Sequence, residues 1–406
     1  MASNDLNTVQ DPPQWNSEPM FQLPSWGEPL IVFSILVASM IVTRRKGFRI
    51  LGKKKTSYDS LLDEPTSPHS SDELLCYDAD SDEGLLGISK HYPKRRRCCG
   101  TVVRTPNTSR FASNIHSRIL MKFPFLIEMF YWIITYIFYR LTKIVSTKIF
   151  SKIGIWDVAM ENGVRLLEIE EESWLRIFFP LTEHNVQAWF MNGHQVLLTV
   201  LNRFYALVHI PGTVGFIAWY YYVAPSHNTF ATARRTLTLT NLFAFVTFTF
   251  YPCMPPRLLP KEYGFLDTVR HDNAQSIWMS GDYVNSLAAM PSMHFGYSFV
   301  IGCVLLYHSG IFRRTLEKGE TRMSRAWQIW YLFLAVAYPL SILITIVATA
   351  NHYWLDAVVA VFVAFLAFLC NKIFIALLPL EDLLLWALRL EKPTPSTGER
   401  YRNERM

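Results

Sequence analysis

Several apolar runs in this chain approach or reach the length of a membrane-spanning helix, and this feature most constrains its fold. A helix needs about 17–25 mostly apolar residues to cross the hydrocarbon core of a bilayer. The runs cover residues 123–144, 205–223, 236–252, 294–312, 327–348 and 353–378. Half of the chain is hydrophobic and 18% is charged, whereas roughly 25% is charged in a soluble domain. The sequence therefore predicts an all-α polytopic membrane protein.

The segments before and between these runs have a different composition. Residues 1–29 are polar and contain proline, so they predict a disordered N-terminus, and the short apolar run 30–43 predicts a possible extra span. Residues 44–121 mix serine with acidic and basic clusters and show little apolar periodicity, which predicts a disordered cytosolic segment. Within the membrane domain, 122–380, the apolar residues of 148–203 recur at helical spacing, which predicts interfacial amphipathic helices. Residues 381–406 are expected to form a cytosolic tail.

Charge and cysteine usage exclude some other classes of protein. The net charge is only +6, and the basic residues stand beside apolar runs, which fits membrane topology better than nucleic-acid binding. The six cysteines have no metal-ligand spacing and give no disulfide framework.

Basic residues in short connections orient the membrane domain. They occur in the flank 44–55, at Arg234–Arg235, in the connection 313–325 and in the C-terminal tail. The positive-inside rule places all four in the cytosol. The segment 253–293 and the turn near 350–352 then fall together on the opposite, extracytoplasmic side.

Three polar motifs, each near the end of a different predicted span, lie on that side. They are YPCMPPRLLP (251–260), PSMHFG (291–296) and ATANHYWLDAV (348–358). The polar side chains that stand out in them are Arg257, His294, His352 and Asp356. Ionisable groups at membrane depth are costly, so by default they indicate function.

The four side chains are the types that phosphoryl transfer requires. His352 and Asp356 are four residues apart, so on a helix the carboxylate faces and orients the imidazole. Ser292 is placed to cap the helix that His294 enters, and a helix N-terminus attracts anions. Arg257, held between prolines, offers a fork suited to phosphate. The structural alternative stays open, because a single histidine at a membrane interface is more often structural, and His209 and His308 receive no role.

The order of these motifs resembles the type 2 phosphatidic acid phosphatase superfamily, and more closely its branch of fungal inositol phosphorylceramide synthases. The likeness covers roughly residues 155–378 and includes NRFYALVHIPGTVGFIAWYYY (202–222), FYPCMPPRLL (250–259), AAMPSMHFGYSF (288–299) and NHYWLDAV (351–358). It implies a six-helix transmembrane bundle with the active site at the outer leaflet, here with an extra N-terminal span and interfacial helices. It also implies a mechanism that needs no cofactor and no metal.

The resemblance assigns a role to each motif residue. His352 is expected to attack phosphorus and form a phosphohistidine, and Asp356 is expected to orient His352. His294 is expected to protonate the leaving alkoxide and then to act as base for the incoming water or alcohol. Arg257 and Ser292 are expected to bind the phosphate oxygens. Two cations of the superfamily pattern are missing, because Phe250 and Ile346 stand at their positions; Lys261, Arg270 or His271 could supply the charge.

Two outcomes of this chemistry and one different class remain open. The resemblance favours headgroup transfer of the inositolphosphotransferase type, with a membrane phospholipid or lipid phosphate as donor and a ceramide-type acceptor. A lipid phosphate phosphatase is the alternative, and a non-catalytic membrane scaffold or lipid transporter is the rival of another class. We expect a multi-pass protein of a eukaryotic endomembrane (Golgi or endoplasmic reticulum) or plasma membrane, with a lumenal or extracellular active site and no nucleic-acid partner.

Overall fold

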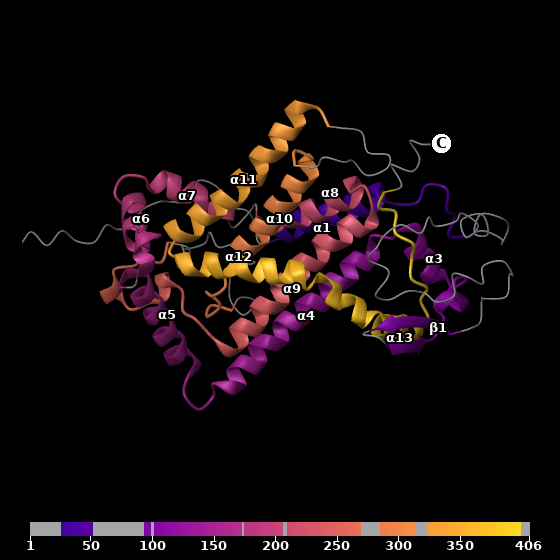
Figure 1. Cartoon of the computed structure of the whole chain (residues 1–406), viewed down its shortest axis with the longest axis horizontal. Helices are drawn as coiled ribbons and strands as arrows, with labels where there is room; N and C mark the ends of the chain where they lie inside the picture. The colour runs from indigo at the N-terminus through magenta and orange to yellow at the C-terminus, as the bar shows by residue number, and fades with distance from the viewer. Residues whose placement is uncertain are drawn as a thin grey trace, which may run out of the picture.

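The chain is almost entirely α-helical, as the sequence predicts (Figure 1). The computed structural model describes residues 26–51, 93–98, 101–172, 174–205, 209–268, 285–312 and 323–398. The sheet found in this part of the chain is a single antiparallel hairpin.

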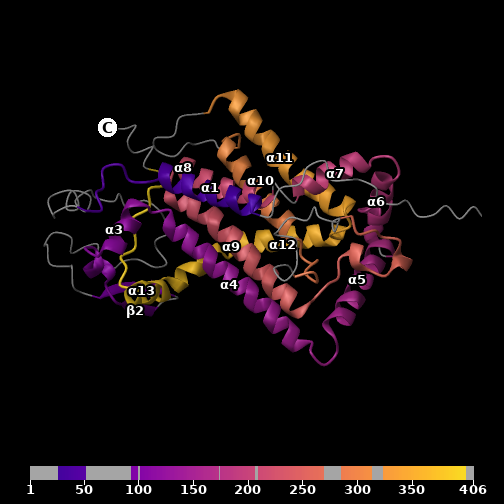
Figure 2. The same cartoon turned by 180° about the vertical axis from the view of Figure 1, so that it is seen from behind.

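A helix occupies each of the six predicted spans. These helices are α4 (Leu126–Ile149), α8 (His209–Val223), α9 (His227–Phe250), α10 (Met293–Ser309), α11 (Arg325–Ala348) and α12 (Trp354–Leu369), and α12 is followed by η10 (Asn371–Leu377) and α13 (Leu378–Ala387). Figures 1 and 2 show α4 running along α9, and α10 beside α11. Of the described helices, α11 alone is long and apolar enough to cross a membrane, and up to three spans result if two bent helix pairs are each counted as one. The number of spans therefore stays a prediction.

Small residues let these helices approach closely. A Cβ atom added at Gly302 of α10 would lie 2.5 Å from the carbonyl oxygen of Ala335 and 3.0 Å from Cγ of Pro339, both in α11. Any side chain at position 302 would therefore push α10 away from α11. Because α10 carries His294 at its start, this contact helps to fix one wall of the candidate site.

Part of the segment 44–121, for which the sequence predicts disorder, has regular secondary structure, while residues 52–92 and 99–100 of that segment lie outside the described residues. Its described residues form the hairpin of β1 (Lys94–Cys98) and β2 (Thr101–Thr105), then η3 (Thr108–Phe111) and α3 (Ile115–Lys122). The hairpin is held by the buried carboxylate of Asp382 in α13, which accepts hydrogen bonds from Arg96 at 2.6 and 3.0 Å and from Thr105 at 2.9 Å. Sequence composition did not predict this order, because the partner carboxylate lies almost 300 residues away.

The remaining N-terminal helix and the C-terminal tail pack together. Helix α1 (Gly27–Val42), which covers the predicted run 30–43, lies against α8. Ser396 donates to the carbonyl oxygen of Thr43 at 2.9 Å, and the Ser396 amide donates to the Tyr221 hydroxyl at 3.2 Å. The described part of the tail is thus held against the helix bundle.

Short helices gather at the opposite end of the bundle from α13 (Figures 1 and 2). They are α5 (Ile155–Glu172), η4 (Trp174–Ile177), α6 (Glu183–Met191) and α7 (Gln195–Arg203). Trp174, Ile177 and Phe178 expose their large apolar side chains here, as expected of interfacial segments. Their position at a membrane interface stays a prediction. Two further turns, η6 (Pro256–Leu258) and η7 (Lys261–Tyr263), complete this end.

Candidate active site

Backbone hydrogen bonds tie the three polar motifs to one another. Cys253 and Ala288 form a parallel bridge, with the amide of Ala289 donating to the Cys253 carbonyl at 3.2 Å. The Arg257 amide donates to the Ala350 carbonyl at 2.9 Å, and the Ser292 amide donates to the Asp356 carbonyl at 3.2 Å. The segments that the sequence placed on one face therefore form one connected unit at the starts of α10 and α12.

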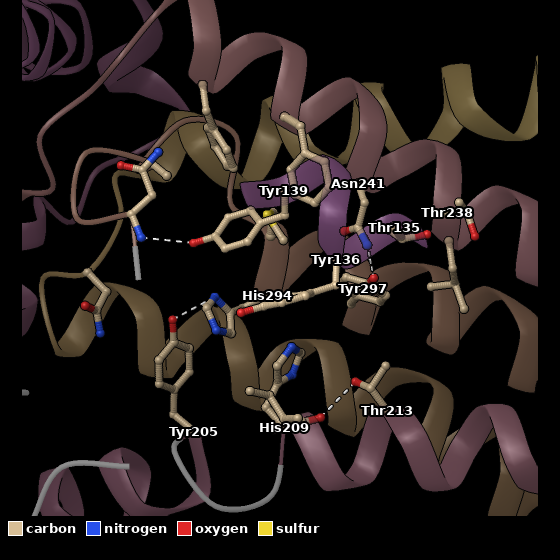
Figure 3. Close-up of a pocket in the computed structure, with 18 of the residues that line it drawn as sticks. Thr135, Tyr136, Tyr139, Tyr205, His209, Thr213, Thr238, Asn241, His294 and Tyr297 are labelled. Atoms are coloured by element: carbon tan, nitrogen blue, oxygen red, sulfur yellow. Dashed lines mark hydrogen bonds between the residues drawn. The ribbon is translucent and has the colours of Figure 1, made fainter. Parts of the chain in front are cut away.

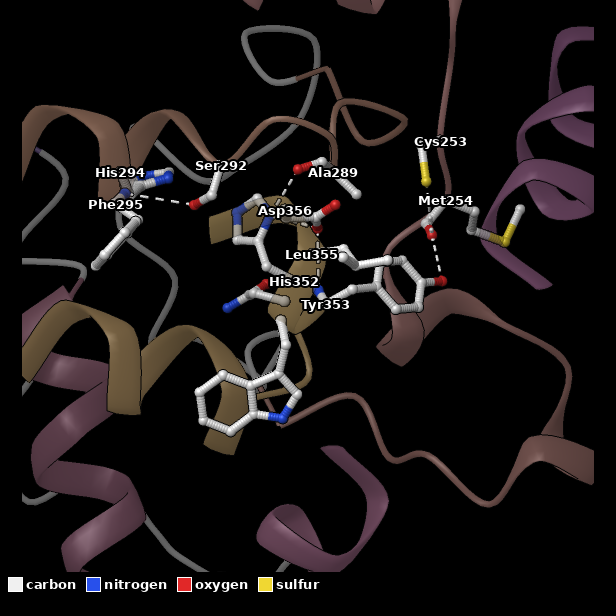
Figure 4. A network of polar contacts seen from close by, with 12 residues as sticks. Cys253, Met254, Ala289, Ser292, His294, Phe295, His352, Tyr353, Leu355 and Asp356 are labelled. Atoms are coloured by element: carbon white, nitrogen blue, oxygen red, sulfur yellow. Dashed lines mark hydrogen bonds and ion pairs between the residues drawn. The ribbon is translucent and has the colours of Figure 1, made fainter. Parts of the chain in front are cut away.

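The position of His352 defines the protonation of its ring (Figure 4). Its Nδ1 lies 2.7 Å from the carbonyl oxygen of Ala289 and 3.1 Å from Oδ2 of Asp356. A carbonyl oxygen can only accept a hydrogen bond, so Nδ1 carries the proton. The neutral ring then has an unprotonated Nε2, which is the nitrogen that a nucleophilic histidine needs. Asp356 is fully buried behind His352 and also accepts from the Tyr353 amide at 2.9 Å.

Three acidic side chains cap the helix that carries this pair. The first amides of a helix have no intrahelical acceptor. In α12, the Tyr353 amide donates to Asp356, the Trp354 amide to Glu183 at 2.9 Å and the Leu355 amide to Glu170 at 2.7 Å. The positive end of the α12 dipole is thus occupied by the protein's own acidic side chains. The N-terminus of α12 is therefore not open to substrate phosphate.

Burial controls the charge of groups around this cap. Burial, followed by the neighbouring Glu183, raises the pKa of the Glu170 carboxyl to about 10. Glu170 is therefore protonated at neutral pH, which reduces the repulsion among the three acids. Burial also raises the pKa of the Cys253 thiol. Cys253 is consequently a neutral thiol and no competing nucleophile.

His294 faces His352 across the site. Their ring centroids are 6.3 Å apart, a separation that leaves room for a reacting group between them. The hydroxyl of Tyr205 lies 2.8 Å from Nδ1 of His294 (Figure 3). A tyrosine hydroxyl can donate to the neutral imidazole or accept from the protonated one, so Tyr205 suits both states of an acid–base histidine. The ring centroid of His209 lies 4.8 Å from that of His294 and 6.4 Å from that of Tyr205.

Arg257 is oriented by two partners. Its Nε donates to Oδ1 of Asn351 at 2.7 Å and its Nη1 donates to Asp267 at 2.9 Å. Nη2 takes part in neither bond. The guanidinium is mostly buried and lines the same cavity as His294 and His352, and its contact with phosphate stays a prediction.

Ser292 has a different position from these residues. It is fully buried, its Oγ accepts from the Phe295 amide at 3.3 Å, and it caps α10. It does not line the cavity. The structure thus bears out the expected cap geometry, and the predicted phosphate contact of Ser292 stays a prediction.

At the two positions where the superfamily pattern has a cation, this chain has an apolar side chain. Ile346 is fully buried in a cluster with Tyr205 and Phe295, where an unpaired charge would be costly. Phe250 is mostly exposed at the end of α9. Lys261 is exposed on η7 and does not line the cavity. Arg270 and His271 lie outside the described residues.

A cavity of about 660 Å³ opens onto the two histidines. This volume is within the 300–1,000 Å³ range of ligand-binding pockets. Arg257 and Asn351 line its polar end together with His294 and His352, while most of its remaining wall is apolar. Among the residues that the structure describes, no group of three His, Cys, Asp or Glu side chains is arranged to hold a metal ion.

Several residues of this site were not identified from the sequence. Tyr205 and Asn351 lie within the quoted motifs but received no role, and Glu170 and Glu183 carry no recognisable motif. Their contacts with His294, Arg257 and the first turn of α12 form only in the tertiary fold. His209 was noted but received no role, and it lines the cavity beside His294. The sequence signal that could have identified His209 as a site residue was its place four residues after Tyr205 on an apolar run.

One comparison with known protein families gave a match. Residues 169–316 and 321–370 match a family model of the PAP2 superfamily, whose members are membrane proteins that generally act as phosphatases or phosphotransferases on phosphate substrates. No curated protein and no solved structure matched the chain. The matched residues include Arg257, Ser292, His294, His352 and Asp356, whereas α1 and α4 lie outside them. The match supports the assignment of the part of the chain that carries the candidate active site to the PAP2 superfamily.

Proposed function

We propose that this protein transfers the phosphorylated headgroup of a membrane lipid through a phosphohistidine on His352. The observation that carries the proposal is the pair of bonds on Nδ1 of His352, to Ala289 and Asp356, which leaves Nε2 unprotonated in the cavity wall. The superfamily match supports the broader class of phosphatase or phosphotransferase.

In the first half-reaction, Nε2 of His352 attacks phosphorus and forms the P–N bond while the P–O bond to the leaving group breaks. Protonated His294 gives its proton to the leaving oxygen, and Tyr205 holds Nδ1 of His294. Asp356 stabilises the positive charge that develops on His352. Arg257 and the amides at the start of α10 are the groups placed to bind the phosphoryl oxygens.

In the second half-reaction, an acceptor hydroxyl gives its proton to His294 and its oxygen attacks phosphorus. The P–N bond breaks and His352 regains its free Nε2. Water as acceptor makes the protein a phosphatase; an alcohol makes it a transferase. We favour an alcohol of the ceramide type with an inositol phospholipid as donor, because the motifs resemble that branch. The phosphatase is the second candidate, since it shares the first half-reaction.

The test uses purified protein in mixed micelles with labelled lipid. The substrates are phosphatidic acid, and phosphatidylinositol with and without ceramide; free phosphate and new lipid products are followed together. We expect a new phospholipid only when ceramide is present, and an acid-labile phosphoenzyme in the wild type but not in His352→Ala. Phosphate release without a new lipid would establish the phosphatase instead.

His308→Ala is the matched control, because His308 is 7% exposed and His352 is 6% exposed. Both variants lose a buried imidazole, but His308 packs against Trp219 and Tyr331, away from the site. Equal turnover in His352→Ala, His308→Ala and the wild type would refute the proposal and favour a scaffold or transporter.

A further inference from the structure

The cavity extends from the histidines far along the helix bundle. On α9 its lining residues are Arg234, Leu237, Thr238, Asn241, Phe245 and Phe248. They recur every three or four residues, so they form one stripe on one face of α9. At 1.5 Å per residue, the stripe from Arg234 to Phe248 is about 21 Å long. One leaflet of the hydrocarbon core is about 15 Å thick, half of roughly 30 Å, so the cavity is longer than one leaflet is deep.

Three threonine hydroxyls on the cavity wall bond within their own helices, whereas the buried Oδ1 of Asn241, in the stripe on α9, has no hydrogen-bond partner among the described residues. The hydroxyls of Thr135, Thr213 and Thr238 each donate to the carbonyl oxygen four residues earlier in their own helices, at 2.8 to 3.0 Å. These hydroxyls therefore already have an acceptor within the protein. At the far end, Nη1 of Arg234 donates to both carboxylate oxygens of the buried Glu128 at 2.7 and 2.8 Å. A group entering this part of the cavity meets a mainly apolar wall.

Helix α4, which runs along α9, supplies another part of the cavity wall. Trp132, Thr135, Tyr136 and Tyr139 of α4 line it, and Pro29 of α1 adds to it. The hydroxyl of Tyr139 also accepts from the amide of Asn285 at 2.9 Å, close to the PSMH motif (Figure 3). Helices α1 and α4 both lie outside the residues that match the PAP2 superfamily. This wall is therefore a feature of the chain that the family match does not account for.

We propose that this cavity binds one hydrocarbon chain of the lipid whose phosphate lies between His294 and His352, and that α4 limits the length of that chain. The inference rests on the proposed function, because the histidines fix where the phosphate end lies. One occupant fits these observations: it is polar at the histidine end, mainly apolar along a cavity whose stripe on α9 is about 21 Å long, and continuous with the headgroup. Thr135 and Thr238, small residues on facing helices near the far end, are the positions that would set its depth.

Photolabelling tests the binding of the chain without requiring turnover. The probe is phosphatidic acid with a diazirine at the end of one palmitoyl chain, in phosphatidylcholine nanodiscs with the full chain. We expect the label on Trp132, Thr135 or Thr238, in the wild type and equally in His352→Ala. Thr238→Trp should remove most of this label, because the indole fills the far end of the cavity. Label confined to outward residues such as Phe333 and Phe362, and unchanged in Thr238→Trp, would overturn the proposal.

Turnover then tests the control of chain length. Thr135→Trp should lower kcat/KM for palmitoyl substrates at least about tenfold relative to hexanoyl substrates, which do not reach position 135. The control variants are Thr147→Trp on α4 and Thr247→Trp on α9, because both threonines make the same bond to their own helix but do not line the cavity. An equal loss for both chain lengths, or an equal selectivity change in the controls, would refute the role of α4.

The two experiments separate this inference from the proposed function. Label in the cavity with no turnover of any lipid would refute the enzyme and retain the chain site. Turnover that His352→Ala abolishes, with no label in the cavity, would retain the enzyme and refute the chain site.

Discussion

Replacing Asp356 by asparagine tests how the site fixes the nucleophile. In the structure, Nδ1 of His352 has two acceptors, the Ala289 carbonyl at 2.7 Å and the Asp356 carboxylate at 3.1 Å. The carbonyl is a backbone group and stays in the variant. It holds the proton on Nδ1 even when the carboxylate is gone. Asp356→Asn should therefore keep the correct tautomer and lose only the charge.

The size of the effect follows from this difference. A hydrogen bond to a charged group contributes about 1.5–3 kcal/mol, and a neutral one about 0.5–1.5 kcal/mol. The loss of about 1–2 kcal/mol corresponds to a rate reduced roughly 5- to 30-fold, since 1.36 kcal/mol is tenfold. Where the substitution lets the imidazole adopt the wrong tautomer, the loss is about 10⁴-fold. The two mechanisms thus predict rates that differ by more than a hundredfold.

Stability should also fall in this variant. The amide oxygen can accept from the Tyr353 amide as Oδ2 does now. The amide nitrogen then takes the place of Oδ1, which is buried and has no hydrogen-bond partner among the described residues. A buried donor without an acceptor costs about 1–3 kcal/mol. Chemical denaturation monitored by tryptophan fluorescence would measure this loss.

The assay measures kcat for the lipid substrate and the amount of trapped phosphoenzyme per folded protein. Asp382→Asn is the control, because Asp382 is also a buried carboxylate but lies at the other end of the molecule beside Arg96. It should lower stability without changing kcat. A 10⁴-fold loss in Asp356→Asn would show that Ala289 does not hold the ring. An unchanged kcat would reduce Asp356 to a helix cap.

Three further variants probe the groups around the nucleophile. Glu170→Gln should flatten the pH dependence of stability. In the wild type the folded pKa of the Glu170 carboxyl, about 10, lies above the ordinary value of 4.5. The wild type therefore loses stability as pH rises between these values, by at most about 1.4 kcal/mol per pH unit. Thermal unfolding at pH 5 and pH 9 measures this, and parallel curves for variant and wild type would contradict it. Arg257→Lys should reduce kcat/KM about 10- to 100-fold, because an ammonium cannot bond Asn351 and Asp267 in the fork geometry and still reach phosphate. Steady-state kinetics with Lys261→Ala as control would measure this loss. An unaltered kcat/KM would exclude a phosphate-binding role for Arg257. Tyr205→Phe should lower kcat about tenfold and shift the limb of the pH–rate profile that reports His294; a fall in kcat with an unmoved profile would indicate packing alone.

The helical fold could be predicted from the sequence because apolar runs and helix signals are local. Each of the six predicted spans contains a helix, since a long apolar run must satisfy its backbone within itself in a membrane. The predicted disorder of 44–121 stays a prediction for residues 52–92, which lie outside the described part of the chain, but residues 94–98 and 101–105 form a hairpin. The order of β1 and β2 depends on Asp382, and no local pattern reports a partner so distant in sequence.

The sequence by itself determined which side chains are the candidates for the chemistry of the site. Arg257, His294, His352 and Asp356 could be chosen because their types and spacing have chemical meaning, and because span ends alternate between the two sides of a membrane. Tertiary structure alone decided how these groups are held. The proton on Nδ1 of His352 is fixed by a backbone carbonyl at position 289, the first turn of α12 is capped by acids from α5 and α6, and α4 closes the cavity. Such contacts join segments tens to hundreds of residues apart, so no local sequence pattern reports them. A backbone carbonyl is present at every position, so the sequence does not mark the one that binds His352.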